Sequence, residues 1–126
     1  VDDLMLTGKK IPFVSENVIM KKALKIINKK KLGVLLVLNK RKETIGIITD
    51  GDIKRATEKN ENIKYLTVKK IMKTKPFSVE KNMLAAKALS IMNSKKITSL
   101  CVNKDKNKKK TIGIIHIHNI LEANVY

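Results

Sequence analysis

Hydrophobic and polar residues follow one another along the chain in an order that occurs twice. Apolar side chains recur at the i, i+3, i+4, i+7 spacing of a helix from Met20 to Ile27, and again from Ala85 to Met92. Each helical segment is followed by two short apolar runs, which predict strands with both faces covered because they do not alternate with polar residues. The predicted strands are 33–38 and 44–49 in the first half, and 98–102 and 111–116 in the second.

The two halves also align with each other residue by residue. Thr44–Ile48 matches Thr111–Ile115 at an offset of 67, two more than the offset of 65 in the preceding helices. The two additional residues fall in the Lys-rich run 104–110, which we expect to be an exposed hairpin tip because a longer loop costs little there. With an extended segment at its start and a second helix at its end, each half is a β-α-β-β-α unit. The copies span about 11–58 and 76–123.

These repeats predict an α+β fold in which two β-α-β-β-α units pack as a pseudo-twofold pair, because one unit alone is marginally stable. Residues 1–66 are assigned to the first repeat with its N-terminal linker, and residues 67–126 to the second. Val1–Met5 resembles Val68–Met72, so a similar segment precedes each repeat. The expected helix start signals are Ser15, Glu16 and Asn17 for the first unit, and Glu80 and Asn82 for the second.

Composition narrows the class of protein. The 126 residues are 43% hydrophobic but only 3% aromatic, so a core is expected in which Ile, Leu, Val and Met dominate. Cys101 lies in an apolar run, where a buried free thiol is expected, and no apolar stretch approaches the length of a membrane span. The start of the chain does not resemble a signal peptide, so we expect a cytoplasmic location without membrane contact.

The formal net charge of +17 raises the question of a nucleic-acid partner. The cations are 26 lysines scattered along the chain, with only Arg41 and Arg55 able to make bidentate contacts, and few aromatic side chains are present to stack on bases. A nucleic-acid partner is therefore disfavoured. Binding of a polyanion stays open as a third function, beside the two given below.

The segment GIITDGDIKR, residues 46–55, carries polar residues where a strand passes into a helix. Thr49 offers a hydroxyl, Asp52 a carboxylate that accepts from paired hydroxyls such as those of a ribose, and Arg55 a fork for phosphate. Free N–H groups at a helix start also favour an anion. Together these groups indicate a nucleotide site. The alternative is that Thr and Asp only cap the helix, and spacing alone favours that alternative.

The second copy has HIHN in the same place, with His116 replacing Thr49 and Asn119 replacing Asp52. His116 can serve as a hydrogen-bond donor, and Asn119 can contact a ribose hydroxyl without the charge, so the second site is expected to be weaker or differently specific. Two histidines also suggest a metal, but no third ligand lies nearby in the sequence, and no metal site is predicted. No catalytic arrangement is evident, so the chain is not expected to be an enzyme by itself.

The repeated unit is similar to a known family. A duplicated β-α-β-β-α unit with a G-h-h-T-x-x-D junction resembles the cystathionine-β-synthase (CBS) domain, which occurs in tandem pairs called Bateman modules. The chain also resembles the C-terminal tandem of the KpsF/GutQ-type arabinose-5-phosphate isomerases. The segments that carry this closer resemblance are, in order, VDDLMLTGKKIPFV, LGVLLV, GIITDGDIKR, VKKIM, KKITSL and GIIHIHNIL.

The resemblance implies the regulatory part of a D-arabinose 5-phosphate isomerase, an enzyme that feeds the synthesis of Kdo, a lipopolysaccharide sugar. The catalytic sugar isomerase (SIS) domain of that family is not present in this sequence. The resemblance further implies a homodimer, no required cofactor, and AMP, ADP or ATP as regulatory ligand; CMP-Kdo is the ligand that feedback in the pathway suggests. Thr49 and Asp52 would hold the first ligand, and His116 and Asn119 the second. Related sequences have Asp at position 119, which puts a full ribose clamp there in doubt. The alternative function is a ligand-free oligomerisation module.

Overall fold

The structure is a computed structural model that describes residues 1–104 and 106–123. The chain divides into two compact units, which are described separately. One unit is Pro12–Pro76, and the other combines Val1–Ile11 with Phe77–Tyr126. The predicted boundaries, 1–66 and 67–126, follow the repeat in the sequence. In the compact units, the segment before the first repeat belongs with the second repeat, and the segment before the second repeat belongs with the first.

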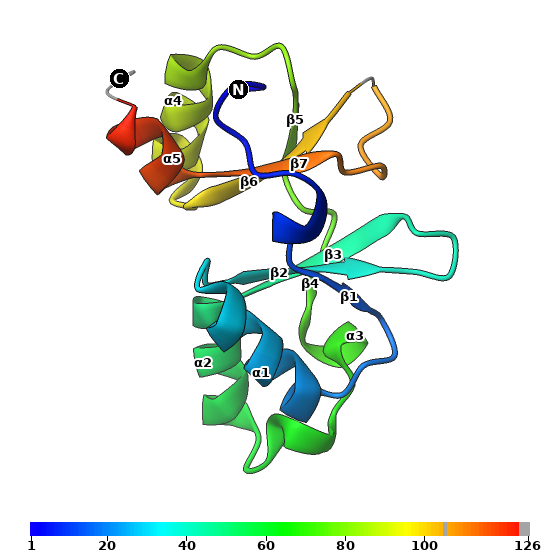
Figure 1. Ribbon diagram of the computed structural model, residues 1–126. Coiled ribbons are helices and arrows are strands. Elements are labelled where there is room, and N and C mark those ends of the chain that lie inside the picture. The colour runs from blue at the N-terminus through cyan, green and yellow to red at the C-terminus, as the bar shows by residue number, and fades with distance from the viewer. Residues whose placement is uncertain (105, 124–126) are drawn as a thin grey trace. The chain divides into compact units, whose positions relative to one another are not determined.

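The unit Pro12–Pro76 is a four-stranded sheet with its helices on one face (Figure 1). β1 runs parallel to β2, and the β2–β3 and β3–β4 pairs are antiparallel, in the order β1-β2-β3-β4. The first five elements form the predicted β-α-β-β-α unit, and the connector adds a fourth strand. In chain order the elements are β1 (Phe13–Ser15), α1 (Met20–Lys30), β2 (Val34–Leu38), β3 (Thr44–Thr49), α2 (Asp50–Lys59), the 3-10 helix η2 (Ile63–Tyr65), α3 (Val68–Ile71) and β4 (Lys73–Thr74).

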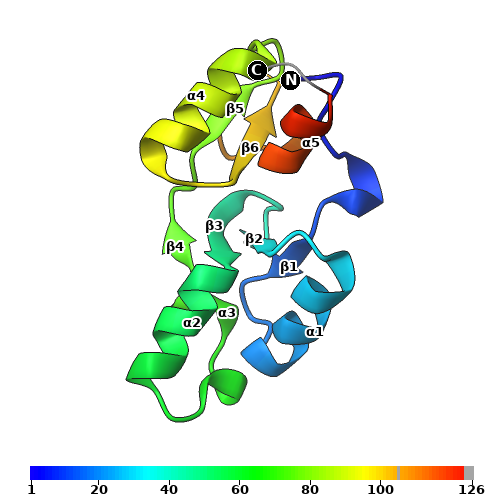
Figure 2. The same ribbon diagram turned by 90° about the vertical axis from the view of Figure 1, so that its left-hand side faces the viewer.

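The other unit repeats this plan with a three-stranded sheet in the order β5-β6-β7. β5 is parallel to β6, and β6 is antiparallel to β7. α4 and α5 pack against each other on the sheet (Figure 2). Its elements are the 3-10 helix η1 (Gly8–Lys10), β5 (Ser78–Glu80), α4 (Ala85–Lys95), β6 (Ser99–Asn103), β7 (Gly113–His116) and α5 (Ile117–Glu122). The predicted α+β class and the duplicated unit are confirmed.

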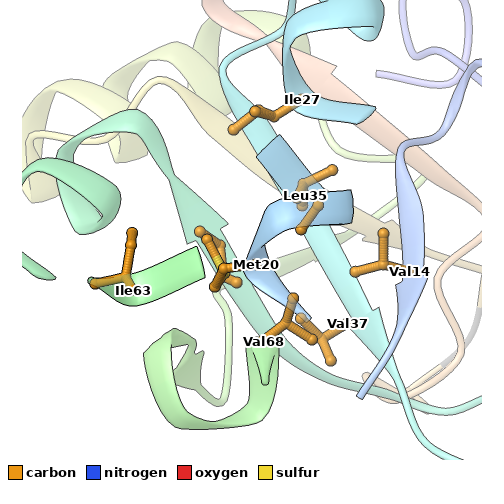
Figure 3. Close-up of a cluster of buried hydrophobic side chains, with 9 residues drawn as sticks. Val14, Met20, Ile27, Leu35, Val37, Ile63 and Val68 are labelled. Atoms are coloured by element: carbon orange, nitrogen blue, oxygen red, sulfur yellow. The ribbon is translucent and has the colours of Figure 1, made fainter. Parts of the chain in front are cut away.

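Each unit has its own core, built from the residues whose spacing predicted the helices and strands. In the unit Pro12–Pro76, Met20 and Ile27 of α1 pack with Leu35 of β2, and the connector contributes Ile63 and Val68 (Figure 3). In the other unit the corresponding core is formed by aliphatic and Met side chains of α4, α5 and the sheet: Val79, Ala88, Met92, Leu100, Val102, Ile115 and Ile120. Fully burying one such side chain stabilises a fold by about 1.5–3 kcal/mol, so these helices are held mainly by packing.

The similar segments that precede the two repeats make equivalent contacts. The Met72 thioether lies against Gly46 of β3, where a side chain would collide with it, and the Met5 thioether lies in the same way against Gly113 of β7. Leu6 then forms an antiparallel bridge with Ile114. Glycine is needed at both strand positions because the methionine comes so close to the backbone.

The predicted helix start signals were wrong for the first helix of each unit. α1 begins after Ile19 and α4 after Leu84, and neither of these residues makes a side-chain capping bond. Ser15 and Glu80 instead end strands β1 and β5. Parallel pairing with the neighbouring strand holds these polar residues extended, so the helix starts later, at an apolar residue.

Two smaller predictions concern burial. Cys101 is a free thiol with 1% exposure, as expected. Burial raises its pKa to about 12, with a Thr111 hydrogen bond acting in the opposite direction. Lys104 and residues 106–110 are exposed between β6 and β7, as predicted for the hairpin tip, and Asp105 lies outside the described residues. Among the helices of the described chain, none combines the length and apolar character needed to cross a bilayer.

Candidate functional site

The first candidate site lies where β3 passes into α2. Thr49 is the last residue of β3 and keeps extended backbone angles, φ −111° and ψ 167°, so that the helix can begin at Asp50. The Thr49 hydroxyl accepts a hydrogen bond from the Asp52 N–H at 3.2 Å, and Asp52 Oδ2 accepts from the Thr49 N–H at 2.9 Å. This reciprocal pair is a capping box, which satisfies backbone donors at the helix start. Capping, the alternative considered for these residues, therefore does occur.

The Asp52 carboxylate has further partners beyond the cap. Its Oδ2 atom also accepts from the Thr49 hydroxyl at 2.9 Å, and its Oδ1 atom accepts from Arg55 at 2.7 Å. The ammonium group of Lys73, on β4, lies 3.3 Å from the same Oδ1. The Asp52 side chain is 4% exposed, whereas those of Arg55 and Lys73 are 58% and 65% exposed. The buried carboxylate of Asp52 is thus held through Oδ2 by Thr49, while its Oδ1 contacts the long, exposed side chains of two cations.

These contacts determine the protonation of Asp52. Burial by itself would raise the pKa of the carboxyl group, because it disfavours the charged form. The hydrogen bonds from the Thr49 backbone, Arg55 and the Thr49 hydroxyl, together with the charge of Lys73, outweigh burial and lower the pKa below its usual value. Asp52 is therefore ionised at neutral pH and can act only as an acceptor.

The sequence predicted that Thr49, Asp52 and Arg55 belong to one site. In the structure these three side chains are linked by hydrogen bonds in one cluster. Arg55 lies over Gly51, where a Cβ would be 3.3 Å from its guanidinium, so the glycine leaves room for this side chain. Sequence reasoning missed Lys73. It lies 21 positions after Asp52 and comes from the two-residue strand β4, which has no hydrophobic periodicity that could have revealed it.

The second candidate site has the same position at the end of β7. The Asn119 side chain accepts through Oδ1 from the His116 N–H at 2.9 Å, and His116 Nδ1 accepts from the His118 N–H at 3.1 Å. The two imidazole rings are stacked, with centroids 4.8 Å apart. Burial lowers the pKa of His116, and the charge of His118 adds to the effect. His116 and Asn119 are therefore brought together as the equivalents of Thr49 and Asp52, with His116 in its neutral form.

The described residues contain no group of three or more His, Cys, Asp or Glu side chains that could hold a metal ion. The chemistry at the two junctions is hydrogen bonding and charge. The first junction offers one buried carboxylate oxygen and two cations, while the second offers neutral side chains. Each arrangement suits the recognition of a polar small molecule.

Comparison with known proteins identifies the repeat. The CBS domain model matches residues 1–59 and 68–126. The chain is 37% identical to protein RP505 of Rickettsia prowazekii and 32% identical to arabinose 5-phosphate isomerase KdsD of Salmonella typhimurium, each over 99% of this chain. It spans only 38% and 37% of the lengths of these two relatives.

Solved structures share the fold. The CBS domain pair of protein MJ0100, in complex with 5′-methylthioadenosine and S-adenosyl-L-methionine, has a TM-score of 0.84 at 21% identity, over 98% of this chain and 94% of its own. CBSX2, in complex with AMP, has a TM-score of 0.81 at 21% identity, over 98% and 93%. The match to the family model covers both repeats, and the chain therefore belongs to the CBS domain family, as a tandem pair of CBS repeats.

Proposed function

We propose that this CBS pair is a regulatory module that binds an adenosine nucleotide or a nucleotide sugar, and that it belongs to a D-arabinose 5-phosphate isomerase of the cytoplasm. The observation that carries the proposal is the arrangement around Asp52. One carboxylate oxygen is fixed by Thr49, and the other is held only by the exposed side chains of Arg55 and Lys73.

A ligand can use this arrangement by exchanging partners. The two hydroxyls of a ribose can donate to Asp52 Oδ1 in place of the two cations, while Thr49 keeps the carboxylate in position. Arg55 and Lys73 are then released to a phosphate group of the same ligand, for which a guanidinium and an ammonium are suited. The site would thus recognise sugar and phosphate together, which is the combination found in AMP, ADP, ATP and CMP-Kdo.

The relatives support the remaining parts of the proposal. KdsD, which shares 32% identity with the chain, is an arabinose 5-phosphate isomerase, and two CBS pairs of the same fold are complexed with adenosine compounds. A ligand regulates an attached enzyme only through different affinities for two states of the protein. The module would therefore act by coupling nucleotide occupancy to the isomerase, as part of a homodimer.

Calorimetry and thermal shift with AMP, ADP, ATP, CMP and CMP-Kdo test the proposal. Asp52→Asn is the decisive variant, because Asn119 shows that an amide in this position still caps the helix. We expect wild type to bind at least one of these ligands, and Asp52→Asn to weaken its affinity about tenfold or more. Arg41→Ala removes the other arginine, which lies in the exposed β2–β3 hairpin, and should leave affinity unchanged. Absence of binding by every ligand, or equal affinity of wild type and Asp52→Asn, would overturn it.

A second candidate function is a ligand-free oligomerisation module. It is favoured by the capping boxes at both junctions, which account for Thr49 and Asn119 without a ligand. Sedimentation velocity with and without the nucleotides separates the two functions. A stable dimer that responds to none of them would support the second function.

A further inference from the structure

A groove of about 720 Å³ lies in the unit that contains β5, β6 and β7. Asn103, the last residue of β6, lines it, whereas His116 pairs with the first residue of β6, at the other end of the strand. The rest of the lining comes from β5, the loop that leads into α4, the first turn of α4 and the β6–β7 hairpin. None of the residues of the two candidate sites is among its described lining residues. The volume is within the range of about 300–1,000 Å³ that is typical of binding sites.

The groove has an apolar part that is open to solvent. Val79 and Met83 line it from β5 and from the following loop, and Leu84 lies beside them with 75% exposure. This is the largest exposed fraction among the large hydrophobic side chains of the described chain. Leu84 precedes α4 but makes no side-chain capping bond, so the helix start does not explain it. A partner that covered this side chain would gain its transfer free energy from water.

Strand β5 offers backbone hydrogen-bonding groups at the same place. It is an edge strand of its sheet and pairs only with β6 (Figure 1). The Lys81 N–H donates to the Asn103 carbonyl at 2.9 Å, so the backbone of residue 81 faces β6. Backbone groups alternate in direction along a strand, so the N–H groups of Ser78 and Glu80 and the Ser78 carbonyl point away from β6. Among the described residues, none of these three groups has a hydrogen-bond partner.

The rim of the groove is positively charged. It carries Lys87 of α4 and Lys106 and Lys108 of the β6–β7 hairpin, whereas Glu80 is the one acid of the described lining. The three lysines are exposed and form no salt bridge within the described chain. A basic rim beside apolar side chains is complementary to carboxylates and apolar groups of a partner. Arginine and aromatic side chains, which a nucleic-acid site would favour, do not occur in the described lining.

We propose that this groove binds an extended acidic peptide segment of a partner protein. The segment pairs with the free edge of β5 as an added strand, lays an apolar side chain against Leu84 and directs its carboxylates to the three lysines of the rim. In this mode of recognition, main-chain hydrogen bonds supply affinity and the side chains supply specificity. The inference goes beyond the proposed function, because none of the groove residues belongs to a candidate nucleotide site.

Fluorescence anisotropy with a labelled heptapeptide of alternating glutamate and valine tests the charge complementarity. We expect the wild-type protein to bind this peptide at physiological salt, and Lys87→Glu to weaken the affinity about fivefold or more. Lys25→Glu makes the same charge change at an exposed position of α1 and should leave the affinity within about twofold. Equal weakening by the two variants, or no binding of the peptide, would overturn the inference. Nucleotide affinity should be the same in Lys87→Glu as in wild type, so either failure leaves the proposed function standing.

Two substitutions at Ser78 test the pairing with β5. Ser78→Pro removes an N–H that points away from β6, and proline is tolerated in edge strands. Ser78→Ala is the matched control, because both variants lose the hydroxyl that donates to the Asn103 side chain. With folding checked by circular dichroism, we expect Ser78→Pro to weaken peptide binding about tenfold and Ser78→Ala to leave it within about twofold. Equal affinities of the two variants would overturn the added strand.

Leu84→Asn tests the apolar contact even if Ser78→Pro does not fold, since asparagine is well accepted in front of a helix. We expect it to weaken peptide binding about fivefold. Unchanged affinity would overturn the placement of the segment against Leu84. An oligothymidylate that binds as tightly as the peptide, with the same loss in Lys87→Glu, would overturn the peptide assignment in favour of a nucleic acid.

Discussion

Replacing Asp52 by Asn should destabilise the protein at neutral pH and make no difference in acid. At pH 7 the variant keeps a capping acceptor for the Thr49 N–H, as Asn119 does for His116 in the second repeat. It loses the charge-assisted hydrogen bonds to Arg55 and to the Thr49 hydroxyl. The attraction to Lys73, at 3.3 Å, disappears as well. The loss in unfolding free energy therefore measures the contribution of the Asp52 charge, because the variant keeps the helix cap.

The magnitude follows from how exposed these partners are. The side chains of Arg55 and Lys73 are more than half exposed, so each ion pair contributes only about 0.2–1 kcal/mol. The buried hydrogen bond from the Thr49 hydroxyl weakens when its acceptor becomes neutral, at a cost of about 0.5–1 kcal/mol. The sum is about 1–3 kcal/mol of unfolding free energy, which corresponds to a melting temperature lower by about 4–15 °C.

The pH dependence has a definite sign. The pKa of Asp52 is lower in the folded protein than in the unfolded chain, where it is near 3.8. The stabilisation from its charge is therefore complete above that value and is lost as the pH falls through the lower folded pKa. Thermal unfolding followed by circular dichroism from pH 7 to pH 2.5 should show the gap between wild type and Asp52→Asn closing only in acid. Asp50→Asn, at an exposed first-turn position, is the control. A gap that persists at the lowest pH, or no gap at pH 7, would refute the electrostatic account.

Three further predictions address other parts of the chain. Gly33→Ala and Gly8→Ala should both lose stability in chemical denaturation, because both positions have positive φ, and Gly33→Ala should lose about 0.5 kcal/mol more. At Gly33 the Cβ would lie 2.7 Å from Asp50 Oδ2, and the exposed Asp50 side chain has to turn away from it. Cys101, buried and with a pKa of about 12, should resist iodoacetamide in the native protein and react at once in denaturant, as mass spectrometry can measure. His116, whose folded pKa lies below its unfolded value of 6.5, should contribute stability that is complete above pH 6.5 and lost as the pH falls through the folded pKa; His116→Thr should reduce this dependence in melting curves.

Each of these predictions has a contrary outcome. Equal losses for the two glycine variants would mean that the backbone angle alone sets the cost. Rapid alkylation of native Cys101 would show that β6 opens readily. If His116→Thr keeps the full acid dependence of the wild type between pH 7 and pH 5, protonation of His116 does not control stability in that range.

The sequence predicted the repeated unit because its information is local. The helices of the core appear as 3.6-residue periodicity, and the strands as apolar runs, so both could be recognised without tertiary contacts. The starts of α1 and α4 could not, because Ser15 and Glu80 resemble capping residues until strand pairing is known. Likewise, only the folded chain shows that Val1–Ile11 packs with the second repeat, while the connector packs with the first.

The candidate site, too, could be predicted only where its residues lie close together in the sequence. Thr49 and Asp52 were found because residues three positions apart lie close together at a helix start. Lys73 was missed because its relevance depends on a contact with Asp52 that only the folded chain makes. One lysine among the 26 of the chain gives no signal in the sequence.

Capping explains part of each junction but cannot explain the difference between them. Asp52 and Asn119 both accept from the backbone N–H of the preceding cap residue, at 2.9 Å in each case, so an uncharged amide serves this purpose as well as a carboxylate. A buried charge costs free energy that a neutral amide does not, and the first repeat offsets that cost with two exposed cations. Partners so exposed contribute little to stability but are free to exchange for a ligand. The charge of Asp52 is thus the feature that a purely structural role leaves unexplained, and Asp52→Asn removes that charge while leaving the cap in place.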